Sequence, residues 1–112
     1  MSHLPELDPL VHSQFRLAVL SILSGADVVG FTYLRERLQT TDGNLSVHLS
    51  KLEKAGYVSV QKQFVERRPV THYRITERGR KALLHYVQDL KSLLELAQGK
   101  GIGSVGKKKE RK

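Results

Sequence analysis

The chain has 112 residues, the size of a single domain, and a formal net charge of +8. It contains no cysteine, which excludes disulfides, thiolate metal sites and cysteine nucleophiles. No apolar run approaches the roughly 18 residues of a membrane-spanning helix, and the first residues lack the basic start and apolar core of a signal peptide. We therefore expect a cytoplasmic protein with no membrane partner.

The positive charge is concentrated in two blocks. Residues 51–81 hold nine Lys or Arg against three Glu, a net charge of +6, and residues 99–112 hold six against one, a net charge of +5. A polyanion such as double-stranded DNA is the natural partner for this distribution, which favours a nucleoid-associated protein. An acidic membrane surface or an acidic protein would be attracted by the same charges.

Two helices are predicted ahead of the basic block. Asp8 and Pro9 are typical of an N-cap and a first helical position, so we expect a helix over residues 9–24. Its apolar side chains cover more than one face, which suggests that a second subunit covers part of it. A short second helix is expected over residues 33–39, with Thr32 as its N-cap.

The third predicted helix, residues 41–55, carries the most information about function. Leucines at 45, 49 and 52 form one apolar stripe at helical spacing, Thr41 is a good N-cap, and Gly56 can end the helix. The opposite face has no acidic residue, and such a face can be a solvated surface or can approach a major groove closely. There, lysines suit phosphate or guanine, Asn44 suits adenine and Val47 suits a thymine methyl group.

A β-hairpin is predicted after Gly56, where the apolar period changes from 3.6 to 2. We expect strands over residues 58–63 and 70–75, joined by a connection at 64–69 in which Pro69 ends the ladder pairing. A helix-turn-helix followed by a hairpin with a basic tip predicts a winged helix. The wing, residues 62–70, would reach DNA backbone or minor groove, where arginine is favoured, through Lys62, Arg67 and Arg68.

The last predicted helix runs from a Thr76 cap to about Gln98. Its apolar residues are spaced 4, 3, 4, 3, as in a coiled-coil seam, and its length of about 32 Å exceeds what a single small core needs. We expect it to mediate dimerisation; the alternative is a helix folded back on its own core. The predicted dimer contacts are Leu10, Leu17, Leu83, Val87, Leu90 and Leu94.

The chain therefore divides into a winged-helix DNA-binding and dimerisation domain, residues 1–98, and a tail, residues 99–112. The tail is rich in glycine and lysine and almost free of apolar residues, so it has no core to fold around. We expect a flexible basic tail that adds salt-sensitive, sequence-blind affinity for DNA. The fold class is mainly α with a small β-hairpin (α+β).

Three stretches of this sequence resemble the small single-domain winged-helix regulators related to the MarR and ArsR families: 41–58, 67–69 and 73–79. The opening 7–12, followed by Arg16, is similar to one subgroup of short members. The resemblance covers about residues 7–96 and implies a homodimeric bacterial or archaeal transcription regulator that binds a pseudo-palindromic site. It adds Ser46 and His48 to the reading face. The predicted DNA-reading residues are Thr41, Gly43, Asn44, Ser46, Val47, His48, Ser50, Lys51 and Lys54.

Other functions are weighed against a regulator that represses transcription. An enzyme is not expected, because the five histidines are scattered and no His-Glu-x-x-His, phosphate loop or Gly-x-Ser-x-Gly motif is present. A metal- or ligand-responsive sensor remains an alternative, since His85 and Asp89 stand at i and i+4. A protein-interaction module, or an architectural, nonspecific DNA binder, is another. We predict no cofactor and no metal; an effector molecule is unknown.

Overall fold

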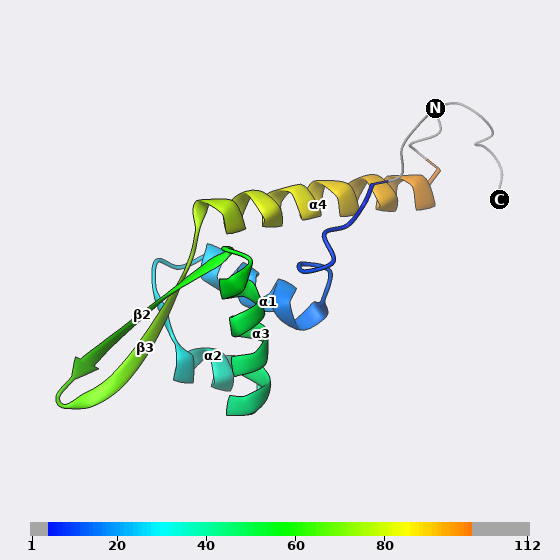
Figure 1. The fold of residues 1–112 in the computed structure, drawn as a ribbon. Coiled ribbons are helices and arrows are strands. Elements are labelled where there is room, and N and C mark those ends of the chain that lie inside the picture. Colours follow the sequence, from blue (N-terminus) through cyan, green and yellow to red (C-terminus); the bar gives the residue numbers. More distant parts are fainter. Residues whose placement is uncertain (1–4, 100–112) are drawn as a thin grey trace.

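The computed structural model describes residues 5–99; residues 100–112, which hold nearly all of the predicted tail, lie outside that range. Within it the chain forms four helices and a three-stranded antiparallel sheet of order β1-β3-β2 (Figure 1). The predicted combination of helices and hairpin is confirmed. The elements are α1 (Gln14–Ser24), β1 (Val29–Gly30), α2 (Phe31–Arg37), α3 (Asp42–Lys54), β2 (Val58–Val65), β3 (Arg68–Ile75) and α4 (Glu77–Ala97).

The start of α1 was predicted wrongly. The helix begins at Gln14 and not at Pro9, and Ser13 is its N-cap, accepting a hydrogen bond from the Arg16 N–H at 3.3 Å. The Asp8 carboxylate closes a separate turn by accepting the Leu10 N–H at 2.9 Å. Its other oxygen accepts the hydroxyl of Tyr57, 2.6 Å away and distant in the sequence. Asp8 therefore attaches the N-terminal segment to the loop after α3.

The start of α2 also differs from the prediction. The helix begins at Phe31 with Gly30 as its N-cap, and Thr32 lies inside it without a capping role. The reason is the short strand β1, in which Val29 pairs with Tyr73 of β3. The chain leaves this strand directly into the helix, so Gly30 occupies the cap position, and glycine has no side chain that could accept a hydrogen bond.

The core lies where α1, α2 and α3 meet the sheet. The three leucines of the predicted α3 stripe, Leu45, Leu49 and Leu52, are at most 2 % exposed, which confirms that stripe. They pack with the buried side chains of the other elements, and this packing determines which face of α3 points outward. These side chains are Val11, Val19, Leu20, Leu23, Val29, Leu34, Val58, Tyr73, Ile75 and Tyr86.

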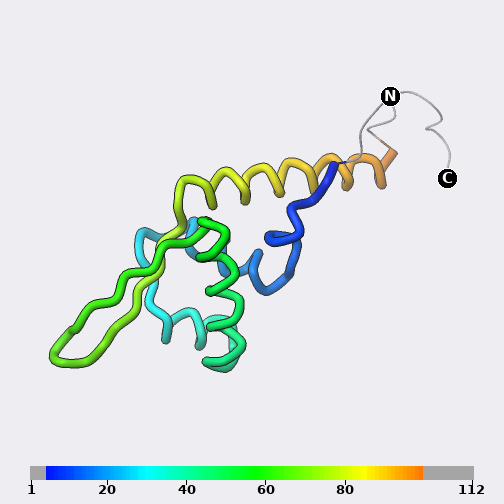
Figure 2. Tube along the Cα trace, in the orientation of Figure 1, coloured from blue at the N-terminus to red at the C-terminus, as the bar shows by residue number. Residues whose placement is uncertain are grey.

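The hairpin is longer than predicted, and it runs out from the three-helix body (Figure 2). The connection is not residues 64–69 but a two-residue turn at Glu66 and Arg67, both with positive φ (51° and 68°), as a type I′ hairpin turn requires. Pro69 does not end the pairing, because it lies in β3 opposite Phe64. Since β1 stops near the base of β3, the outer side of β3 at Pro69 is an open edge, where proline is tolerated.

A tight junction joins the end of α3 to the start of α4. The Thr76 hydroxyl accepts the Gly79 N–H at 2.9 Å and donates to the Gly56 carbonyl at 2.6 Å, while the Thr76 N–H donates to the Tyr57 carbonyl at 3.0 Å. Gly79 is buried so close to this loop that a Cβ atom would lie 2.2 Å from the Tyr57 oxygen. Gly56 has a φ of +81°, which confirms its role in ending α3. The junction orients α3, the hairpin and α4 relative to one another.

The second half of α4 leaves the body of the molecule (Figure 1). Tyr86 is the last buried residue of this helix, and its hydroxyl lies 2.9 Å from His12 Nδ1. Beyond it Val87, Leu90 and Leu94 are 42–57 % exposed, so this half does not fold back on the protein's own core. In the described part of the chain, no helix has both the length and the apolar character needed to cross a membrane.

Candidate nucleic-acid interface

The outward face of α3 carries most of the predicted reading residues. Because the leucine stripe is buried, seven of the nine are exposed, namely Thr41, Gly43, Asn44, Ser46, Val47, Lys51 and Lys54. Ser50 and His48 are half-buried. The exposed set combines two lysines with small or polar side chains, so phosphates and base edges can come close to the helix backbone.

The first turn of α3 is held by two side-chain hydrogen bonds. Thr41 accepts the Asn44 N–H at 3.1 Å, which confirms Thr41 as the N-cap. The amide nitrogen of Asn44 donates to the Thr40 hydroxyl at 2.9 Å. An asparagine amide carries two N–H donors and one acceptor oxygen. One donor and the acceptor of Asn44 therefore remain available to an adenine edge.

An ion pair across the turn between α2 and α3 was not foreseen. Arg35 Nη1 lies 2.8 Å from an Asp42 carboxylate oxygen, and this hydrogen bond raises the pKa of Arg35. The Asp42 side chain is 69 % exposed and that of Arg35 33 %, so this surface pair contributes little to stability. Its effect is electrostatic, because it neutralises an acid beside the predicted reading face. The signal in the sequence was a pair of opposite charges flanking the expected turn.

His48 faces α1 more than it faces outward. Its ring stacks on Phe15 with the ring centroids 4.6 Å apart, and its Nδ1 lies 3.1 Å from Arg16 Nη1. Arginine can only donate, so Nδ1 accepts and the proton of the neutral ring is on Nε2. Burial, and then the charges of Arg16 and Lys51, lower the pKa of His48. A reading role for His48 stays a prediction, and it would have to use the Nε2 edge.

The wing is basic and, up to Pro69, exposed. Every residue from 61 to 69 is exposed, including the predicted contact residues Lys62, Arg67 and Arg68. The hairpin tip and the N-terminal end of α3 both lie on the side of the molecule away from α4 (Figure 1). The fold therefore brings the two predicted DNA-contacting elements to one side.

The possible metal pair lies far from this side, on α4. His85 Nε2 is 3.8 Å from an Asp89 carboxylate oxygen, so helical spacing does bring the two together. Zinc sites need three or four protein ligands. Residues 5–99 contain no group of three or more His, Cys, Asp or Glu that could hold a metal ion.

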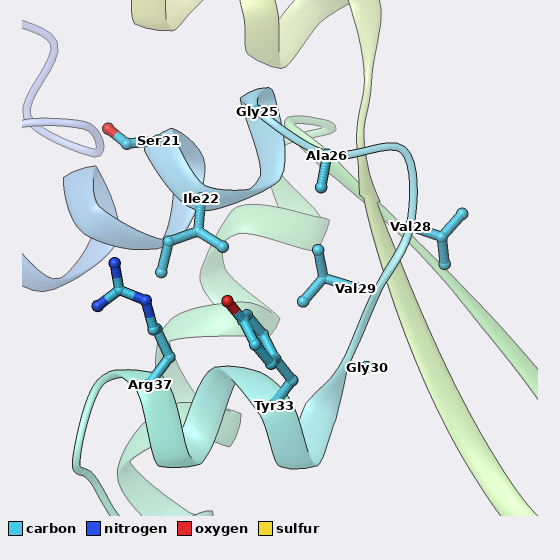
Figure 3. A pocket seen from close by; sticks show the side chains of 9 residues that line it. All are labelled: Ser21, Ile22, Gly25, Ala26, Val28, Val29, Gly30, Tyr33 and Arg37. Atoms are coloured by element: carbon cyan, nitrogen blue, oxygen red, sulfur yellow. The ribbon is translucent and has the colours of Figure 1, made fainter.

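An open groove of about 630 Å³ lies between α1 and α2 (Figure 3). Its volume is in the range of small-molecule sites, and its polar side chains are Ser21, Tyr33 and Arg37. None of its lining residues belongs to the predicted DNA-reading or wing sets. The residues that line it are Ser21, Ile22, Gly25, Ala26, Val28, Val29, Gly30, Tyr33 and Arg37.

Comparison with known proteins agrees with this geometry. A family model described as a winged helix DNA-binding domain matches residues 15–94. The chain belongs to this family. It is 38 % identical to an uncharacterized protein of Methanocaldococcus jannaschii over 84 residues, which are 75 % of this chain and 91 % of that protein.

Solved structures of transcriptional regulators share the fold. A transcriptional regulator homologue from Pyrococcus horikoshii has a TM-score of 0.74 and 26 % identity, covering 79 % of this chain and 87 % of its own. The M. tuberculosis regulator MosR, solved in complex with DNA, has a TM-score of 0.64 and 21 % identity. The match covers 89 % of this chain and 68 % of that chain. A MarR family member is also among them. The predicted winged-helix fold is confirmed, and the family and the fold are those of DNA-binding transcriptional regulators.

Proposed function

We propose that the protein is a sequence-specific transcriptional repressor that binds double-stranded DNA as a homodimer. Helix α3 enters the major groove, and the β2–β3 wing lies on the backbone or in the minor groove. The observation that carries this proposal is the set of exposed predicted reading residues on α3, which includes two lysines and no acid, together with a basic wing on the same side. The M. tuberculosis neighbour solved with DNA supports the same use of the fold.

The exposed apolar row on α4 supports the homodimer. Val87, Leu90 and Leu94 stand in water at coiled-coil spacing, and contiguous apolar surface of this kind marks interaction sites. Leu10, Leu17 and Leu83 already pack partly against the protein's own core, so the outer half of α4 carries most of the proposed contact. A two-fold dimer would present two α3 helices to successive major grooves about 34 Å apart. Repression would follow from blocking polymerase on nucleoid DNA.

Anisotropy of labelled DNA at physiological salt tests the proposal. The full chain and a version ending at Gln98 are titrated into the DNA upstream of the gene and into a scrambled duplex. We expect both versions to prefer the upstream DNA by about 10³-fold or more. No preference in either version would contradict a sequence-specific regulator and favour an architectural DNA binder. Binding that disappears on truncation would assign it to the tail.

Substitutions then separate the roles of helix and wing. Arg67→Ala and Arg68→Ala should weaken binding to all sequences alike, because backbone contacts carry no base information. Lys81→Ala removes the same charge from an exposed position at the start of α4, away from the wing, and is the matched control. Asn44→Ala should alter base preference at one position of each half-site. Equal effects of Arg67→Ala and Lys81→Ala would refute the wing assignment.

A further inference from the structure

A large aromatic side chain stands in water near the tip of the wing. Phe64 is 76 % exposed, although burying such a ring in a core would be favourable. Val60 is the last residue of β2 that packs against the core. The hairpin therefore continues about 17 Å past it, at about 3.3 Å per residue. Folding of the body makes no use of Phe64.

The strand register combines Phe64 with a second rigid apolar residue. Phe64 lies opposite Pro69, and because side chains alternate along a strand, Lys62 is on the same face. Val65, opposite Arg68, points to the other face. Phe64 and Pro69 thus form a narrow apolar ridge beside the tip.

Positive charge flanks this ridge near the tip of the wing. Lys62 lies on the same face as Phe64, Arg67 lies in the turn, and Arg68 lies on the opposite face of the hairpin, against one nearby acid, Glu66. Arg74 is at the base of β3 and pairs with Asp27 at 3.3 Å, so it does not belong to this group. Such a balance favours a polyanion over a membrane interior or a neutral protein surface. DNA-binding proteins that act on the minor groove combine basic side chains with apolar wedges that unstack a base step and bend the duplex.

We propose that Phe64, backed by Pro69, is an apolar wedge that enters the minor groove and partly unstacks one base step. Lys62, Arg67 and Arg68 bind the phosphates on either side of the groove. This inference rests on the proposed DNA-binding function and adds a bend to it. The wedge should favour pyrimidine–purine steps at the wing position, because these steps unstack most easily.

The test uses the full chain and a duplex selected by the wild-type protein from a random pool. The duplex carries 2-aminopurine at the wing position, whose fluorescence rises on unstacking, and end labels that report bending by energy transfer. Phe64→Ala should weaken binding roughly tenfold and abolish both signals. Val65→Ala, an apolar truncation on the opposite face of the same strand, is the control and should keep both.

Salt dependence distinguishes the wedge from the charges. Phe64→Ala removes no charge, so the slope of log affinity against log salt should stay unchanged, whereas Arg67→Ala should reduce it by about one. Phe64→Leu retains apolar bulk and should keep part of the signals. Because Phe64 is exposed, thermal unfolding of Phe64→Ala should match the wild type, which excludes misfolding as the cause of any loss.

The possible outcomes are distinct. If Phe64→Ala binds the selected duplex as well as the wild-type chain does and gives the same signals, the proposed wedge is refuted. The proposal of a sequence-specific regulator is then unaffected. Equal losses in Phe64→Ala and Val65→Ala also overturn the wedge. If the wild-type chain selects no duplex from the pool, the regulator and the wedge are both overturned, and the exposed ridge would serve a protein partner.

Discussion

Replacing Gly79 by alanine should damage the junction that orients α3, the hairpin and α4. The added Cβ would lie 2.2 Å from the Tyr57 oxygen and 2.9 Å from a side-chain carbon of Ile75. To restore a 3.0 Å approach to that oxygen, the start of α4 must move away from Tyr57 by about 0.8 Å. The Tyr57 carbonyl belongs to the backbone and cannot rotate away, and it already accepts the Thr76 N–H.

The cost can be estimated from these contacts. Overpacking costs about 1–3 kcal/mol, and the rigid neighbour puts Gly79→Ala near the upper end. Weakening the Thr76 hydrogen bond adds about 1 kcal/mol, and the better helix propensity of alanine returns up to about 1 kcal/mol. We expect a net loss of about 3 kcal/mol. For a domain of this size that loss lowers Tm by at least about 12 °C.

Urea and thermal unfolding followed by circular dichroism measure this loss. Gly43→Ala is the matched control: Gly43 lies in α3, and an added Cβ meets nothing within 4 Å. This control should gain up to about 1 kcal/mol from helix propensity. The reasoning would be refuted if Gly79→Ala unfolded like the wild type, or if both variants lost stability equally.

Two further predictions concern His48 and the dimer. Folding lowers the pKa of His48 below its ordinary value of 6.5. Below pH 6.5 the unfolded chain therefore binds more protons at this residue than the folded protein does, so the free energy of unfolding should fall as the pH drops through 6.5. Well above pH 6.5 this group should not affect stability. Urea unfolding between about pH 7.5 and pH 5 should show a smaller loss for His48→Gln than for the wild type, and an identical loss would contradict the shift. Leu90→Glu should convert the dimer to monomer in sedimentation velocity and weaken binding to the preferred DNA, whereas Lys91→Glu on a neighbouring face should do neither. A monomeric wild type would refute the homodimer.

The helix that carries the proposed reading face could be predicted from residues close together in the sequence. Thr41 caps α3 through a hydrogen bond to Asn44, three residues away, and the leucine stripe depends on helical spacing alone. The alternating side chains of β2 and β3, and the Thr76 cap of α4, could also be predicted from residues that are near one another in the sequence. The exposed face of α3 followed directly, because burying one stripe of a helix leaves the opposite face outside.

Contacts between distant parts of the chain decided the rest. The hydrogen bond from Tyr57 that attaches Asp8 to the loop after α3 joins residues 49 positions apart, and β1 is too short to form without β3 beside it. Likewise, Pro69 is tolerated only because β1 stops short of it.

The same division applies to the candidate interface. The sequence by itself determined which residues of α3 face away from the core, because helix period and capping act within a few residues. Only the tertiary structure decided that His48 turns toward Phe15 and Arg16, that Arg35 neutralises Asp42, and that the wing projects far enough to leave Phe64 in water. These features depend on where separate elements pack against one another, which no local pattern encodes.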